Sequence, residues 1–427
     1  MKKIIRIFVF LALAGVLAFT GYNVFFLKPK VHNLDKLEKL PRKKEISLLV
    51  SPRAYVDRVT VKAIQGMKEV ILFDGKLPET INEITFIVEP KKIGLSDGSA
   101  LIRVTLRRFV ILKETFEVKT LIDTQPPRVR LLWAPYMVIQ GGSGGIKAQL
   151  SEDADLWVEV GGRKFRSYPV PDRENQRIAL FGVPVETSTR DVIKVVAVDL
   201  AGNRTVIPLG TGIKKNRFKK FRIELKGKEN LITPKLFTII AGETDKLDFV
   251  SAFKEVNEKI RKINEEKISE IGQKSSPVKR WKGRFLQLKN SKVLSYYGEK
   301  RSYYYNGKYI SSSRHLGYDL ASVKNAPVPA ANSGVVVFAG DLGIYGNSVI
   351  IDHGYGLMSL YAHMADFRVK EGEEVKKGQI IGVTDSTGLA FGDHLHFGIL
   401  ISGYEVTPIE WWDAKWIRTR IDPLFSD

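Results

Sequence analysis

Five of the six histidines in the chain lie between positions 315 and 396. Two of them, His394 and His396, are separated by a single leucine in "GDHLHFG". In a β-strand the residues i and i+2 point to the same side, so both imidazoles share one face while Leu395 points the other way. Burying two imidazoles side by side is costly unless another group satisfies them. The fold must therefore supply a partner for this pair, or leave it on a solvent-facing edge strand.

Other candidate ligands lie upstream of this pair. His315 and Asp319 are four residues apart in "HLGYD", an offset that keeps both on one face of either a strand or a helix. His363 follows in "LYAHM", and His353 lies at a glycine-containing hairpin turn, where we interpret it as structural. The chain has no cysteine, which excludes disulfides and thiolate metal sites. A metal in this region would be bound by His, Asp or Glu.

Ordered motifs in the last third of the chain resemble a known family. These motifs are His315-x-x-x-Asp319, "APVPAANSGVVVFAG", Tyr361-Ala-His363, "GEEVKKGQIIG" and His394-Leu-His396. Through them the chain resembles, over about residues 283–410, the lysostaphin-type (LytM-like) zinc metallopeptidases. The resemblance implies a small, mostly antiparallel β domain, which we place at 281–427, with one Zn²⁺ in a narrow groove between loops.

The same resemblance implies a role for each residue of the site. His315, Asp319 and His396 correspond to the zinc ligands, and His363 and His394 correspond to catalytic residues beside the metal. Three protein ligands leave the fourth tetrahedral position of zinc for water, whose pKa zinc lowers to about 7. The two catalytic histidines then orient or deprotonate water, protonate the leaving amine or stabilise the oxyanion. Which of them is the base and which the acid stays open.

The chain departs from the family pattern at two positions. Asp385 stands where the family often has Gly, and Asp393 where it often has Pro. If the strand is regular, Asp393 points away from His394. We expect these residues to alter the shape of the loop or the response to pH, without loss of zinc.

The N-terminus carries an uncharged segment. Lys2, Lys3 and Arg6 precede a run from Ile7 to Leu27 that has no charged residue. A helix of this length, roughly 21 residues, can cross a hydrocarbon core of about 30 Å. The basic flank predicts a cytoplasmic N-terminus and a single-pass protein of the cell membrane, with the C-terminal bulk on the extracytoplasmic (periplasmic or cell-wall) side. A cleaved signal peptide is the alternative.

The segments between these two regions predict a mainly β, multidomain protein. A chain of 427 residues is long enough for two to four domains. The segments "DTQPPRVRLL" and "VVAVDLAGNRT" resemble the start and finish of bacterial immunoglobulin-like β-sandwich repeats. The predicted divisions are 1–30 cytoplasmic tip and transmembrane helix, 31–45 charged spacer, 46–122 β module (immunoglobulin-like as an option), 123–208 immunoglobulin-like β-sandwich, 209–280 linker with an amphipathic helix, and 281–427 zinc metallopeptidase domain.

The amphipathic helix is predicted over residues 246–272. Its apolar face is expected to contain Phe249, Phe253, Val256, Ile260 and Ile263, which recur at steps of three and four. The helix could dock on a neighbouring domain, inhibit the enzyme or mediate dimerisation, and the sequence does not decide among these.

The charge of the chain bears on its partners. A formal net charge of +20 indicates a polyanionic neighbour or a diffuse solvated surface. No arginine-rich helix, zinc-finger spacing or RNA-binding signature indicates nucleic acid. Together with the predicted anchor, the resemblance to the lysostaphin-type family implies a membrane-anchored zinc metalloendopeptidase that hydrolyses peptide cross-links of peptidoglycan, a polyanionic polymer, with a protein regulator as a possible further partner. The alternatives are a non-catalytic scaffold or activator of other cell-wall hydrolases, and a peptidase of another surface polypeptide.

Overall fold

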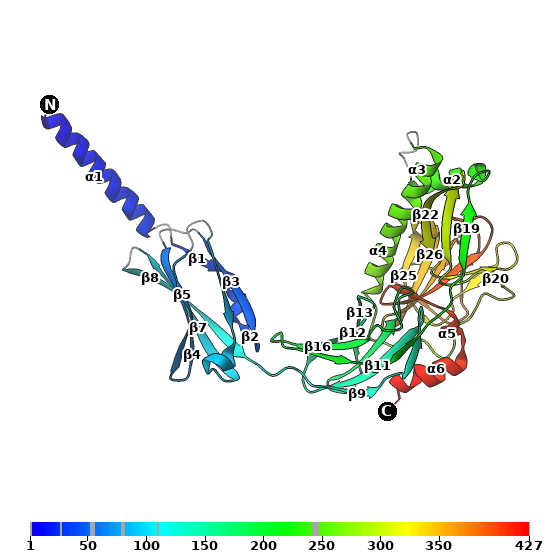
Figure 1. Ribbon diagram of the computed structural model, residues 1–427, viewed down its shortest axis with the longest axis horizontal. Coiled ribbons are helices and arrows are strands. Elements are labelled where there is room, and N and C mark those ends of the chain that lie inside the picture. The colour runs from blue at the N-terminus through cyan, green and yellow to red at the C-terminus, as the bar shows by residue number, and fades with distance from the viewer. Residues whose placement is uncertain are drawn as a thin grey trace. The chain divides into compact units, whose positions relative to one another are not determined.

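The chain folds into two compact units that are built mainly from β-strands (Figure 1). The computed structural model describes residues 2–25, 28–51, 56–77, 82–108, 111–240 and 247–426. The first unit comprises Met1–Pro127 with Val198–Thr205, and the second comprises Arg128–Ala197 with Val206–Asp427. The prediction of a mainly β, multidomain protein is confirmed, whereas the predicted domain limits stay predictions.

The predicted membrane anchor is wrong. Within the part of the chain that the structure describes, no helix is both long enough and apolar enough to cross a membrane. Helix α1 covers Lys2–Phe25, and the end of the predicted span, residues 26–27, lies outside the described residues. Polar residues at positions 20, 22 and 23 end the continuous apolar stretch that begins at Ile7. At 1.5 Å per residue that stretch is about 20 Å long, which is shorter than a hydrocarbon core of about 30 Å.

Two sheets form the first unit, in the orders β1-β3-β6 and β2-β8-β7-β4-β5. Burial alternates along their strands, as in β6, because successive side chains of a strand point to opposite faces. The buried faces of both sheets contribute to one apolar core, which makes a β-sandwich. The strands are β1 (Lys30–His32), β2 (Lys39–Leu40), β3 (Lys44–Ser51), β4 (Val56–Gln65), β5 (Lys68–Gly75), β6 (Glu83–Val88), β7 (Gly98–Arg108) and β8 (Leu112–Ile122).

Two four-stranded sheets, in the orders β14-β15-β11-β9 and β13-β12-β16-β17, form a second β-sandwich around a shared core. Its likeness to immunoglobulin-like repeats stays a prediction. Strand β10, which follows β9 in the chain, and strand β18, which follows β17, form a separate parallel pair. The strands are β9 (Val129–Trp133), β10 (Met137–Ile139), β11 (Ser143–Leu150), β12 (Ala154–Val160), β13 (Arg163–Arg166), β14 (Tyr168–Pro169), β15 (Gln176–Gly182), β16 (Lys194–Asp199), β17 (Arg204–Pro208) and β18 (Gly212–Lys214).

The C-terminal part of the second unit is built on an eight-stranded sheet in the order β20-β23-β30-β27-β26-β25-β28, with β31 paired to β30. Two smaller sheets, β19-β21-β22 and β24-β29, complete it. The strands are β19 (Lys220–Glu224), β20 (Lys292–Ser295), β21 (Lys300–Tyr305), β22 (Lys308–Arg314), β23 (Tyr318–Ala321), β24 (Pro327–Pro329), β25 (Gly334–Asp341), β26 (Asn347–Gly354), β27 (Leu357–Ala362), β28 (Glu374–Val375), β29 (Ile380–Val383), β30 (Leu395–Ile401) and β31 (Tyr404–Val406). The helices are α2 (Glu229–Ile240), α3 (Phe249–Lys254), α4 (Arg261–Gly272), α5 (Ile409–Trp412) and α6 (Ala414–Arg420).

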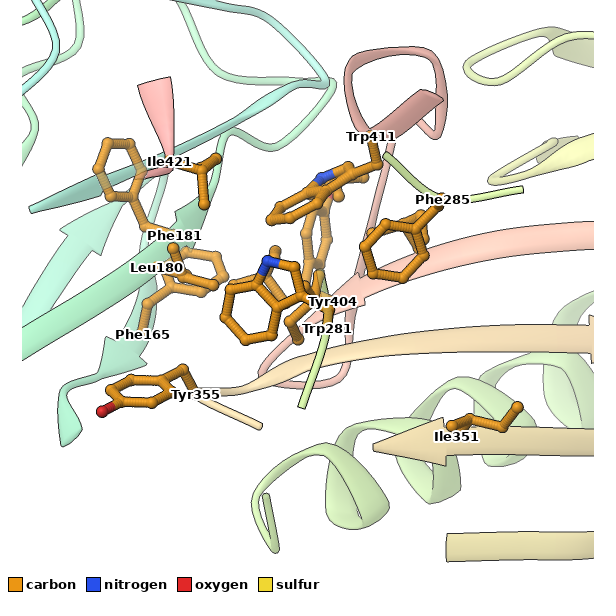
Figure 2. Packing of buried hydrophobic residues seen from close by; sticks show 14 of the residues in the cluster. Phe165, Leu180, Phe181, Trp281, Phe285, Ile351, Tyr355, Tyr404, Trp411 and Ile421 are labelled. Atoms are coloured by element: carbon orange, nitrogen blue, oxygen red, sulfur yellow. The ribbon is translucent and has the colours of Figure 1, made fainter. Parts of the chain in front are cut away.

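One apolar core joins the second β-sandwich to the C-terminal part, as Figure 2 shows. The ring centroids of Phe165 on β13 and Tyr404 on β31 are 6.4 Å apart, with the rings nearly perpendicular. Phe285 meets Trp411 of α5 at 5.6 Å in a similar edge-on arrangement. Edge-on aromatic pairs at these distances add about 0.5–1.5 kcal/mol to the free energy gained by burying their area. The sandwich therefore supports the C-terminal part directly.

Most of the predicted apolar face docks on the C-terminal part: Phe253 and Val256 are buried in one apolar cluster, and Phe249 and Ile260 pack against it. Ile263, however, is 59% exposed, and Asn264 and Ile268 are buried instead. A π-helical segment, η4 (Glu255–Ile260), connects α3 to α4. Because a π turn holds an extra residue compared with an α turn, it rotates the following side chains to a new direction. The apolar pattern alone does not reveal this rotation.

Candidate metal centre

Three potential metal-ligand atoms meet where two neighbouring strands of the large sheet, β23 and β30, lie beside the end of β22. Asp319 on β23 lies directly opposite His396 on β30, and His315 follows immediately after β22. Asp319 Oδ1 is 2.9 Å from His315 Nε2 and 3.0 Å from His396 Nδ1, and these two nitrogens are 3.0 Å apart. All three residues are buried. The structure thus brings together the three residues that the sequence analysis assigns to zinc.

The hydrogen bonds of His315 determine which of its ring nitrogens is free. Nδ1 of His315 is 3.1 Å from the carbonyl oxygen of Tyr296. Because a carbonyl oxygen only accepts hydrogen bonds, Nδ1 carries the proton, and in the neutral ring Nε2 presents a lone pair. That lone pair faces the carboxylate of Asp319 at hydrogen-bond distance. A lone pair facing a carboxylate is repulsive unless a cation lies between them, so the donor set fits a metal ion.

His363 and His394 lie beside this cluster. Nδ1 of His363 donates to the carbonyl of Thr387 at 2.8 Å, and Nδ1 of His394 donates to the carbonyl of Gly392 at 2.7 Å. The ring centroids of the two histidines are 4.9 Å apart. In both neutral rings the unprotonated nitrogen is therefore Nε2, and that of His394 is 3.6 Å from Asp319 Oδ1. Backbone carbonyls thus hold both imidazoles in the tautomer that can accept a proton at Nε2.

The pKa values of Asp319, His363 and His396 are lowered, whereas that of His394 is raised, because the effect of burial is outweighed by the hydrogen bond to Asp319 and its charge. Burial by itself raises the pKa of Asp319, but in the metal-free cluster the charge of a protonated His315 and hydrogen bonds from protonated histidines lower it well below its ordinary value. Burial lowers the pKa of His396 to about 4. For His363, burial and then the charges of His394 and His396 lower the pKa well below the ordinary value. An ionised carboxylate and neutral imidazoles are the forms that bind divalent metals.

The loop before His394 is anchored by the residue that departs from the family pattern. Asp393 Oδ1 accepts a hydrogen bond from Thr384 Oγ1 at 2.5 Å, and Oδ2 accepts one from the backbone N–H of Asn325 at 2.7 Å. Both carboxylate oxygens are therefore directed away from the metal cluster. Thr384 also accepts from the backbone N–H of Ala326. Asp393 links two loops and leaves the histidine pair free to face the cluster.

The cluster opens into a cleft of about 500 Å³. Its walls include side chains from elements outside the zinc-binding motifs: Ile223 of β19, Phe253 of α3, Tyr303 of β21, Tyr345 and Phe391. The ring of Tyr345 packs edge-on against His396 with centroids 5.5 Å apart, and its hydroxyl donates to Glu405 Oε1 at 3.2 Å. The backbone carbonyl of Tyr345 accepts a hydrogen bond from the N–H of His363. Tyr345 therefore contacts both His396 and His363.

Comparison with known proteins identifies the family. The family model described as peptidase family M23 matches residues 313–408. A lipoprotein NlpD from Yersinia enterocolitica is 42% identical over 94 residues, which cover 22% of this chain and 96% of that relative. The chain belongs to peptidase family M23. The M23 region contains all five residues of the predicted site.

Two further relatives share this M23 region. The DD-carboxypeptidase/endopeptidase Mpg from Neisseria meningitidis serogroup B is 43% identical over 95 residues, 22% of this chain and 22% of that protein. The murein hydrolase activator NlpD from Salmonella dublin is 39% identical over 102 residues, 24% of this chain and 27% of that protein. The match thus spans 22% and 27% of the length of these two relatives.

Several residues at the site were not predicted from the sequence. The carbonyl of Tyr296 selects the tautomer of His315, and Tyr345 packs against His396. Arg301 of β21 lies 3.7 Å from Asp319 Oδ2. These residues lie outside the local histidine motifs, and their roles depend on contacts that no sequence spacing encodes.

Proposed function

We propose that this chain is a zinc metalloendopeptidase that hydrolyses peptide cross-links of peptidoglycan. The observation that carries the proposal is the convergence of His315, Asp319 and His396 at one end of an open cleft, next to two histidines with fixed tautomers. This combination of ligands and proton-transfer groups is what metal-assisted amide hydrolysis requires.

In this proposal His315, Asp319 and His396 hold one Zn²⁺. Two imidazoles and one carboxylate are a ligand set of catalytic zinc sites, which leave one coordination position open. When bound, zinc acts as a Lewis acid and lowers the pKa of water to about 7. The orientation of His315 is maintained by its Nδ1–H bond to the carbonyl of Tyr296, the kind of outer hydrogen bond that supports metal-binding imidazoles.

His363 and His394 move the protons of the reaction. The oxygen of a water molecule bonds to the carbonyl carbon of the substrate, and Nε2 of one histidine takes the proton that water loses. The C–N bond of the amide then breaks, and the leaving nitrogen receives a proton from a protonated Nε2. The geometry is compatible with either histidine as the base, because both present Nε2 and their ring centroids are 4.9 Å apart.

The relatives support this substrate class and also suggest a second function. A DD-carboxypeptidase/endopeptidase shares the M23 region, and so does a murein hydrolase activator. The second candidate is therefore a non-catalytic activator of other cell-wall hydrolases. The chain has both His363 and His394, which metal binding itself does not need but amide hydrolysis does. Their presence favours the enzyme over the non-catalytic activator.

Incubation of the full chain with purified peptidoglycan, with and without a chelator, tests the proposal. We expect new amino termini only when zinc is present. His363→Asn should abolish their release, whereas His32→Asn, at the histidine on β1 outside the cluster, should leave it unchanged. Intact peptides together with stimulation of a separate hydrolase would support the activator instead.

A further inference from the structure

The cleft beside the metal cluster has an excess of positive charge. Of the two acidic residues that line it, Asp319 belongs to the ligand cluster and both carboxylate oxygens of Asp393 are hydrogen-bonded. A bound metal ion would add further positive charge. The cationic residues among the described lining residues are Lys228, Arg261, Arg301 and Arg314.

Two of these cations are already committed to internal hydrogen bonds. Arg261 Nε donates to the carbonyl of Asn257 at 3.3 Å, and its Nη2 donates to the side-chain oxygen of the same residue at 3.1 Å. Arg314 Nε donates to Glu186 Oε1 at 2.7 Å, and its Nη1 donates to the carbonyl of Gly298 at 3.0 Å. Their guanidinium groups are therefore held in place by the protein itself.

Arg301 is placed differently. Its Nη2 forms ion pairs with Glu299 Oε2 at 3.6 Å and Asp319 Oδ2 at 3.7 Å, and both distances are longer than an ordinary hydrogen bond. Its side chain is 26% exposed. On β21, Arg301 and Tyr303 point to the same side, and Ile223 of β19 lies opposite Tyr303 in the register. All three line the cleft, so the guanidinium lies on its wall next to the metal cluster with donors available for a ligand.

We propose that Arg301 binds a free carboxylate of the substrate, carried by the residue that supplies the scissile nitrogen. This inference rests on the proposed function. Arg301 is then a specificity-determining residue, which selects peptides that bear a carboxylate next to the cleaved bond. A guanidinium presents a planar fork of N–H donors that matches a carboxylate with two hydrogen bonds.

The short distance from Arg301 to the ligand cluster indicates which carboxylate it can reach. Oδ1 of Asp319 lies next to His315 Nε2, and Oδ2 of the same carboxylate lies 3.7 Å from Arg301 Nη2. A single carboxylate group therefore bridges the distance between the ligand histidine and Arg301. Successive Cα atoms of a peptide are 3.8 Å apart, which confines the recognised group to a residue flanking the scissile bond. On the acyl side the α-carboxyl carbon is the scissile carbonyl itself. The nearest free α-carboxylate therefore belongs to the amine side.

Two kinds of peptide carry such a carboxylate. One is a peptide whose last residue is removed, and the other is a cross-link formed through a side-chain amine on the carbon that also bears the carboxylate. A bond between two interior residues of a linear peptide lacks it. The proposal thus predicts a preference between substrates that share the same scissile amide.

A competing role for Arg301 is to orient Asp319 without touching the substrate. In that case replacement of Arg301 would reduce zinc binding and would lower the turnover of every substrate equally. The substrate-binding role instead predicts an effect that depends on the carboxylate, with zinc content unchanged.

A matched pair of synthetic cross-linked peptides separates these roles. One peptide has the free carboxylate next to the scissile nitrogen, and the other has a carboxamide there. With the zinc-loaded full chain, we expect kcat/KM to favour the carboxylate by roughly tenfold or more, because hydrogen bonds to charged groups are strong. Arg301→Met should remove the preference while keeping zinc content and turnover of the carboxamide, and Arg301→Lys should retain part of it. The control Arg261→Met, which removes the same charge from the same cleft, should retain the preference.

Binding to the zinc-free chain provides a second readout that does not depend on catalysis. Calorimetry should show tighter binding of the carboxylate peptide than of the carboxamide for the natural chain, and equal binding of both for Arg301→Met. An unchanged preference in Arg301→Met, no preference in the natural chain, or loss of zinc in that variant would each overturn the proposal. If the natural chain cleaves neither peptide but still binds the carboxylate selectively, the proposed hydrolysis is wrong and the carboxylate site stands.

Discussion

Replacement of Glu410 by Gln is expected to change how the stability of the second unit depends on pH. Glu410 lies on α5, and its Oε2 accepts hydrogen bonds from the backbone N–H of Ser143 at 2.8 Å and from the Ser143 hydroxyl at 2.9 Å. Ser143 begins β11 of the sandwich, and its hydroxyl also accepts from Nε1 of Trp411 at 3.0 Å. The contact therefore joins a C-terminal helix to the β-sandwich at a buried site.

The size of the expected change in the free energy of unfolding follows from the pKa of the Glu410 carboxyl. Burial raises the pKa of Glu410 from 4.5 to about 7, although hydrogen bonds from Ser143 act in the opposite direction. At 1.36 kcal/mol per pH unit, this difference between the unfolded and folded states corresponds to about 3 kcal/mol. Since the folded state holds the proton more tightly, the stabilisation is complete below about pH 4.5 and is lost as the pH rises through about 7.

Chemical unfolding followed by tryptophan fluorescence at pH 4.5, 6 and 8 measures this effect. A chelator should be present so that metal binding does not contribute. The free energy of unfolding of the natural chain should fall by about 3 kcal/mol more than that of Glu410→Gln between pH 4.5 and 8. Glu266→Gln, a replacement of an exposed carboxylate on α4, serves as the control for the loss of one acidic group.

Gln at position 410 can accept the hydrogen bonds of Ser143, but its amide group adds a buried N–H donor, which lowers the stability of the variant. For this reason we compare how stability changes with pH rather than its absolute value. The cost of the added donor is the same at every pH and cancels in the comparison. A stability difference between the natural chain and Glu410→Gln that stays constant within about 0.5 kcal/mol from pH 4.5 to 8 would refute the reasoning.

Three further predictions concern the metal, the docked helix and a turn. His396→Ala should lose most bound zinc in metal analysis after dialysis, whereas His363→Ala should keep it and lose turnover; the reverse pattern would exchange their roles. Asn264 Oδ1 accepts a buried backbone N–H at 2.9 Å, so Asn264→Ala should destabilise the second unit by about 1–3 kcal/mol in chemical unfolding, and a change below about 0.5 kcal/mol would contradict this. Gly354 has a φ of 96° and its added Cβ would collide with the carbonyl oxygen of Val278, so Gly354→Ala should cost roughly 2–4 kcal/mol in the same assay, and a neutral effect would show that the turn can rearrange.

Two sequence predictions were wrong, the membrane-spanning helix and the position of Ile263 on the buried helix face. Each relied on a simple pattern, absence of charge or a constant helical period, that leaves out a property of the folded chain. The N-terminal span was predicted from an absence of charge, but uncharged polar residues shorten the apolar stretch. The apolar stripe that includes Ile263 was drawn with one constant helical period. The π-helical segment Glu255–Ile260 breaks that period, and Asn264 occupies the buried face instead.

The metal cluster was accessible to sequence analysis because its spacings are local. An offset of four keeps two side chains on one face of either a strand or a helix, and an offset of two does so in a strand, so His394 and His396 could be expected to share a side in a strand. Both imidazoles do approach Asp319 Oδ1, at 3.6 Å for His394 and 3.0 Å for His396. The lack of cysteine further limited the candidate ligands to His, Asp and Glu.

The sequence by itself thus determined the kinds of donor atoms, their order along the chain and the strand faces that carry them. Only the tertiary structure decided that Asp319 lies opposite His396, that Nε2 is the free nitrogen of His315, His363 and His394, and that Arg301 lies at the edge of the cluster. These features depend on strand register and on backbone carbonyls contributed by loops far away in the chain. Local spacing carries no information about such contacts, because the same short motif fits many long-range pairings of strands and loops.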